Sequence, residues 1–135
     1  MRRVVVLLAV AAAAAGAAGC SADQGPVAGE LSVRLATPRT TDRAVLFRVT
    51  GPAHGVKGWS GSTYRVVSDT SATGDTSWVA VISPQGTGLA AGEIARVEVP
   101  DTRNVGNYRI SFTEAAASDY SVGAFSGITL TIVKP

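Results

Sequence analysis

Residues 43–50 of this chain read RAVLFRVT, and this stretch decides the fold class. Val45, Phe47 and Val49 place a large apolar side chain at every second position. A period of two residues is typical of a β-strand that buries one face. A Gly-Pro pair follows directly, and proline cannot donate to a strand ladder, so the strand is expected to end there.

The same alternation returns along the rest of the chain, in short segments separated by turn-forming residues. The further segments are 31–35, 63–67, 77–82, 93–99, 107–113 and 127–133, and residues 69–75 are expected to form a loop. Beyond the apolar N-terminus, no window of helical length has the apolar spacing expected of a helix. The sequence therefore predicts an all-β fold, an antiparallel β-sandwich of about seven to nine strands.

The middle apolar residue of each alternating segment is the best candidate for the core. We expect Phe47, Val97, Ile110 and Leu130 to be among the most buried side chains. Trp78 is also expected in the core, because its neighbours at a spacing of two are small and apolar.

The N-terminus has the pattern of a targeting segment. A positive Met1-Arg2-Arg3 precedes an apolar stretch, and Ala17-Ala18-Gly19-Cys20 supplies small residues before the only cysteine of the chain. This arrangement resembles the signal and lipobox of bacterial lipoproteins. The resemblance implies cleavage before Cys20, acylation of its thiol, and an extracytoplasmic, lipid-anchored location at the bacterial cell envelope. An ordinary secretory signal remains the alternative, because Ala-Ala-Gly also suits a soluble-secretion peptidase.

Three segments follow from this interpretation: a signal peptide over 1–19, a flexible tether over 20–29 and a sandwich domain over 30–135. The formal charge of the chain is +2, and Arg2 and Arg3 account for all of it. The domain after the leader is therefore neutral. Its charge gives no support for nucleic-acid binding, and the membrane is expected as a partner only through the lipid on Cys20.

The C-terminal half has a characteristic order of elements. A glycine opens the alternating segment 92–99, a second strand follows at 108–112, and Ala117-Ser118-Asp119 precedes the closing segment 127–132. This order resembles the tail of cohesin-type and related carbohydrate-binding sandwiches. The resemblance implies an Ig-like or cohesin-like jelly roll with an extracytoplasmic binding role, and no catalytic residue is carried over with it.

The sequence contains no complete catalytic pattern. His54 is the only histidine and lies in a turn sequence, where we expect it to be exposed. Residues 58–62 (GWSGS) have the wrong glycine spacing for a nucleophile elbow. One histidine and one cysteine cannot supply the ligands of a zinc site. The sequence predicts no enzyme and no cofactor.

Two loops carry oxygen ligands that calcium could use. Asp69 and Asp75 bracket the first, and Asp101 and Asn104 lie in the second. Neither loop has the spacing of a known calcium motif, and loop aspartates commonly accept hydrogen bonds from their own backbone. We expect these side chains to stabilise turns rather than bind metal.

Aromatic residues outside the predicted core are the remaining candidates for ligand contact. Trp59 lies in a segment of small residues, and Tyr64 and Tyr120 lie near predicted strand ends. Exposed rings of this kind can stack on sugars. The alternative for Trp59 is an inward position that caps one end of the sandwich.

The sequence as a whole favours a non-enzymatic binding or interaction module, cohesin-like in its fold, whose partner is another protein or a carbohydrate. Two alternatives stay open: a structural envelope protein with no small-molecule ligand, and a carbohydrate-binding module. A structural protein would meet its partner through an unpaired strand edge.

Overall fold

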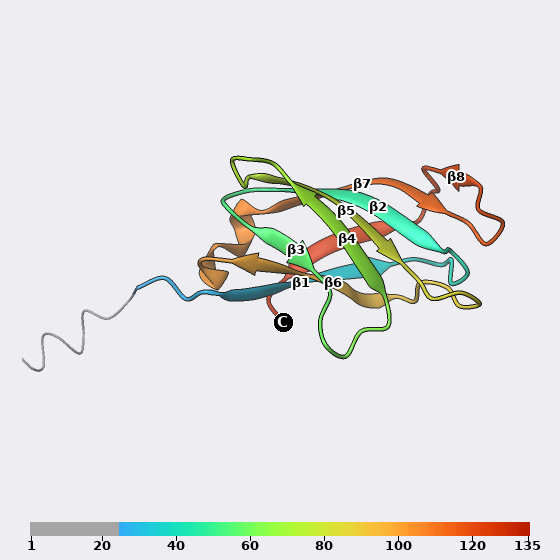
Figure 1. Ribbon diagram of the computed structural model, residues 1–135, viewed down its shortest axis with the longest axis horizontal. Coiled ribbons are helices and arrows are strands. Elements are labelled where there is room, and N and C mark those ends of the chain that lie inside the picture. The colour runs from blue at the N-terminus through green and yellow to red at the C-terminus, as the bar shows by residue number, and fades with distance from the viewer. Residues whose placement is uncertain (1–24) are drawn as a thin grey trace, which may run out of the picture.

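A computed structural model describes residues 25–135, which form two antiparallel β-sheets (Figure 1). The predicted β-sandwich is confirmed. The expectations for the leader and for Cys20 fall outside the described residues and stay predictions. Within residues 25–135, no helix is both long enough and apolar enough to cross a membrane.

The two sheets contain four and five strands. In spatial order, the four-stranded sheet contains β3 (Gly55–Lys57), β6 (Gly92–Val99), β1 (Gly29–Ala36) and β9 (Thr129–Val133). The five-stranded sheet contains β4 (Arg65–Thr70), β5 (Thr76–Ile82), β2 (Ala44–Thr50), β7 (Arg109–Ala116) and β8 (Val122–Gly123). A 3-10 helix, η1 (Thr102–Asn107), connects β6 to β7. The strands β3 and β8 were not predicted, because three and two residues are too short to show a period of two.

The core lies between the sheets and consists of the inward members of each alternation. Phe47, Val97 and Leu130 are buried, as predicted. Ile110 is only partly buried, so this expectation was wrong. The reason is its position on β7, which has only the two-residue β8 beyond it and therefore lies close to the rim of its sheet.

The position of Trp78 also corrects the prediction. Its side chain is 53% exposed, whereas Val79 and Val81, which follow it on the same strand, point into the core. Val79 lies opposite Phe47 on β2, and this register sends Trp78 to the outer face. Both faces of β5 are apolar, so its alternation alone does not tell which face is buried.

The loop predicted over 69–75 is shorter than expected. β4 continues through Thr70, and Asp69 pairs with Trp78 across the hairpin. Asp69 is therefore a strand residue with an exposed side chain rather than part of a turn. This change in register matters for the site, because it places a carboxylate beside an exposed tryptophan.

Candidate functional site

His54 is the first candidate, and the structure corrects its predicted exposure: the ring is partly buried. Its Nδ1 donates to the Pro52 carbonyl oxygen at 2.7 Å, and its Nε2 lies 3.1 Å from Ser77 Oγ. The edge of the imidazole packs against the Tyr108 ring with 5.6 Å between centroids. These contacts tie the turn after β2 to β5.

The His54–Ser77 pair lacks the other parts of a catalytic triad. In a triad a carboxylate orients the imidazole, and the hydroxyl is open to substrate. Here a backbone carbonyl occupies Nδ1, and Ser77 is 0% exposed. Ser77 Oγ also lies 3.0 Å from Thr70 Oγ1, so the chain of hydroxyls is satisfied internally. The geometry therefore suits a structural role.

The two aspartate-containing loops are held by internal hydrogen bonds. Asp75 accepts from Ser71 Oγ at 2.9 Å and from Thr73 Oγ1 at 2.7 Å, and these hydroxyls lower the pKa of its carboxyl. Asp101 is the N-cap of η1, and its ion pair with Arg103 holds its pKa well below the usual range. Within residues 25–135, no three His, Cys, Asp or Glu side chains are placed to hold a metal ion.

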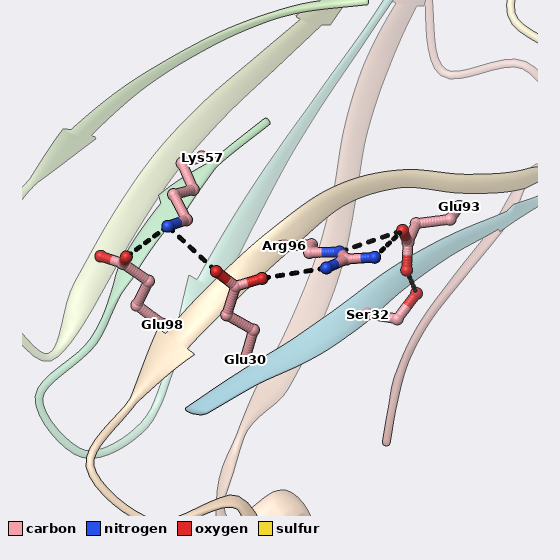
Figure 2. A network of polar contacts seen from close by, with 6 residues as sticks. All are labelled: Glu30, Ser32, Lys57, Glu93, Arg96 and Glu98. Carbon is pink, nitrogen blue, oxygen red and sulfur yellow. Dashed lines mark hydrogen bonds and ion pairs between the residues drawn. The ribbon is translucent and has the colours of Figure 1, made fainter. Parts of the chain in front are cut away.

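A network of charged side chains covers the outer face of the four-stranded sheet (Figure 2). We call it the charged network; its members are Glu30, Lys57, Glu93, Arg96 and Glu98. Arg96 reaches Glu30 at 3.2 Å and Glu93 at 3.0 Å. Lys57 bridges Glu30 and Glu98, so that strands β1, β3 and β6 are linked by side chains as well as by their ladders.

Every member of the charged network already has a partner of opposite charge. Hydrogen bonds from Lys57 first, and then from Arg96, lower the pKa of the Glu30 carboxyl. The Ser32 hydroxyl beneath the network is fully buried and donates to Glu93. A ligand would have to displace these contacts, so this face is poorly suited to recognition.

Trp59 lies next to the charged network. The Arg96 guanidinium is 5.7 Å from the centroid of the indole, within the range of a cation–π contact. The Trp59 side chain is partly buried, neither in the core nor freely exposed. The ring therefore matches neither the sequence expectation of an open platform nor the alternative of a cap inside the sandwich.

The structure does not bring the three predicted contact aromatics together. Tyr64 is partly buried against the core, and its hydroxyl accepts a hydrogen bond from the Ala90 amide at 3.1 Å. Tyr120 is 67% exposed in the turn before β8. Tyr64 directly precedes β4, so the two tyrosines lie by opposite edges of the five-stranded sheet.

The outer face of the five-stranded sheet carries a different set of side chains, which we call the Trp78 face. It consists of Leu46 and Arg48 on β2, Val67 and Asp69 on β4, and Trp78 and Ala80 on β5. Asp69 and Arg48 both lie directly opposite Trp78, one on each side, on strands about 4.8 Å away. The next row is centred on Ala80, which lies opposite Val67 on one side and Leu46 on the other.

The Trp78 face is hollowed and largely apolar. An open hollow of about 260 Å³ is lined by the residues of this face other than Arg48, together with Phe47, Ser68, Val79 and Thr113. Val67 is 47% exposed beside Trp78. Neither Arg48 nor Asp69 forms an ion pair or side-chain hydrogen bond within the described part of the chain. Their polar groups are thus free to meet a ligand that lies on the indole.

The Trp78 face was not predicted from the sequence, because the alternation along residues 77–82 favoured a core position for Trp78. A signal was present: residues 78–82 are apolar at every position, which is unusual for a strand with one solvent-exposed face. A doubly apolar strand at the surface indicates either a covered sheet or a binding face.

Comparison with models of known protein families finds no match for this chain. Searches of curated proteins and of solved structures also find no match. The resemblances to the lipobox and to cohesin-type sandwiches remain predictions from the residues.

Proposed function

We propose that this protein is a carbohydrate-binding module whose ligand stacks on Trp78. The single observation that carries the proposal is the 53% exposure of this indole in the middle of an open sheet face. Large exposed apolar groups mark interaction sites more often than scattered small ones. The C–H groups of a pyranose ring match the flat, electron-rich face of an indole.

The polar groups beside Trp78 favour a sugar over a purely apolar ligand. Asp69 offers hydrogen-bond acceptors and Arg48 offers donors, one on each side of the ring. A hydroxylated ring that stacks on the indole can use both. The apolar row of Val67, Ala80 and Leu46 extends the platform toward a second ring.

Binding without cleavage is the simplest activity for this arrangement. Glycoside hydrolysis ordinarily takes two carboxylates that flank the scissile bond. On the five-stranded sheet the carboxylates of Asp69 on β4 and Glu114 on β7 lie three strand spacings apart, about 14 Å, too far to flank one bond. The proposal is therefore a recognition module rather than an enzyme.

The location that we propose is the outside of a bacterial envelope, with the domain held to the membrane by a lipid on Cys20. A neutral domain offers no second electrostatic signal for the membrane. A Cys20→Ser variant is expected to leave the membrane fraction or to accumulate as an uncleaved precursor. Finding it as membrane-bound and as fully processed as the parent would rule out the anchor.

The chain offers a matched control for the binding test, because it has two tryptophans on opposite outer faces. Binding is measured on an array of β-linked hexose and N-acetylhexosamine oligomers, followed by titration calorimetry with any hit. Trp78→Ala is expected to abolish binding while it shifts the melting temperature by only a few degrees. Trp59→Ala should bind like the parent.

Conservative variants test whether the two polar residues beside Trp78 contact the ligand. Asp69→Asn and Arg48→Gln should each weaken binding about tenfold, because each removes a charged hydrogen-bond partner. Equal binding by Trp78→Ala and the parent, or loss of binding only in Trp59→Ala, would overturn the proposed site.

A further inference from the structure

Four strands, β3, β9, β4 and β8, end the two sheets, and three of these ends are protected against pairing with another chain. β8 reaches only Ala115 and Ala116 of β7, and the rest of that strand carries the charged residues Arg109 and Glu114. β3 and β8 are short, at three and two residues. β4 carries Arg65 and Asp69, and its Ser68 hydroxyl donates to the Val56 carbonyl of β3 at 2.8 Å. Short length, charge and cover by another strand are the usual means by which edges are blocked.

β9, the fourth edge, is longer than β3 and β8 and uncharged, and β7 of the other sheet packs near it without a hydrogen bond between them in residues 25–135. The sequence of β9 is TLTIV, with no charge and no proline, and four of its five residues are β-branched. One side of β9 pairs with β1. No hydrogen bond from elsewhere in residues 25–135 reaches its other side. The backbone groups there form a ready template for one more strand.

We infer that β9 pairs with β9 of a second copy, antiparallel about a two-fold axis at Thr131. This axis places Thr131 opposite itself, Thr129 opposite Val133, and Leu130 opposite Ile132. Two four-stranded sheets then join into one continuous sheet. The contact is isologous, since each copy uses the same surface.

The side chains of β9 suit a second copy better than an unrelated strand. Leu130 points into the core and Ile132 is only partly buried, so their pairing would extend the apolar layer across the axis. Thr129, Thr131 and Val133 are exposed and would meet on the outer face. An uncharged strand pairs with itself without like-charge repulsion.

The pairing also has a natural limit. The opposite edge of the joined sheet is β3, which is too short to continue it. The assembly therefore stops at a dimer. The Trp78 face lies on the other sheet and stays open, so this inference does not depend on the proposed ligand.

A charge swap at the axis tests the inference. The full chain with Cys20→Ser, which excludes a lipid or disulfide at that position, is studied by sedimentation over a hundredfold range of concentration. Thr131→Lys and Thr131→Glu should each shift the chain to monomer, because equal charges then lie directly opposite. An equal mixture of the two variants should restore the dimer. Ala36→Lys, on the outer face one strand away from the edge, is the control and should dimerise like the parent.

Cysteine cross-linking in the same Cys20→Ser chain tests the register independently. Thr131→Cys should form a disulfide-linked dimer on mild oxidation, since directly opposite residues lie within disulfide reach. Thr129→Cys should not, because four residues along a strand separate its two copies by about 13 Å. A parent that stays monomeric throughout, or a dimer unaffected by the Thr131 charges, would overturn the inference.

Discussion

The two outer faces of the sandwich differ in how their side chains are satisfied. On the four-stranded sheet, Lys57 and Arg96 neutralise the carboxylates around them, and Arg96 also covers Trp59. On the five-stranded sheet, Trp78 stands between Arg48 and Asp69 without such contacts. One face uses its charges for internal cohesion, and the other leaves aromatic and polar groups available.

This difference distinguishes a tryptophan that stabilises the fold from one that is available to bind a ligand. Both indoles lie near an arginine in the fold, but only that of Trp59 has the guanidinium over its ring. A ring that is already stacked gains little from a ligand. An uncovered ring on a rigid strand can bind without a large loss of conformational entropy.

The largest loss of stability is expected from a substitution in the core, which lies beneath both outer faces. Phe47 is 2% exposed, and Phe47→Ala removes the whole phenyl ring and leaves a cavity between the sheets. The expected loss of unfolding free energy is about 3–5 kcal/mol, a large share of the stability of a domain of this size. Urea denaturation measures it. A loss below about 1 kcal/mol would show that the two sheets do not depend on this contact.

A smaller change in melting temperature is expected when one arginine is removed from each outer face, and it should differ between the two faces. Arg96→Ala leaves Glu30 and Glu93 without their shared partner and uncovers Trp59, so the melting temperature should fall by several degrees. Arg48→Ala is the matched change on the other face and should shift it by less than about 2 °C. Calorimetry of both variants checks the contrast, and equal shifts would contradict it.

The smallest expected effect is on how the free energy of unfolding depends on pH. The pKa of Glu30 is lowered, so its contribution to stability is present at neutral pH and is lost as the pH falls below about 4.5 and through the lowered value. In Glu30→Gln this part of the pH dependence disappears. The variant should be less stable than the parent at pH 7, and the gap should close on acidification.

Glu114→Gln is the matched control for loss of a carboxylate outside the charged network, because Glu114 lies on the five-stranded sheet and has no ion pair within residues 25–135. At pH 7 this variant should be about as stable as the parent. A gap between Glu30→Gln and the parent that persists to pH 3 would show that lost packing, rather than lost charge pairing, explains the variant.

Much of the fold could be predicted from the period of two along the chain. Val45, Phe47 and Val49 face inward as expected, because a half-buried strand leaves this pattern in its sequence. β3 and β8 could not be found in this way, since their pairing is decided by neighbours distant in sequence. The partial burial of Ile110 could not be predicted either. How deeply a side chain is buried depends on how far its strand lies from the edge of the sheet, and alternation does not encode strand order.

The candidate site was less predictable than the fold. Trp78 and Val79 are adjacent and both apolar, so sequence alone cannot say which of them faces water. The decision comes from register, because Val79 lies opposite Phe47 across the sheet. His54 was misjudged for a similar reason: its partners Ser77 and Tyr108 are more than twenty positions away.

The position of β1 has a consequence for the timing of folding. This strand is made early in synthesis, yet it lies inside its sheet between β6 and β9. Ser32 pairs with Val133, roughly a hundred positions later, so β1 cannot gain both neighbours until β9 has been made. The four-stranded sheet is therefore completed only after β9 has left the ribosome. Refolding of the chain is expected to take milliseconds to seconds, as in other proteins dominated by distant strand pairs.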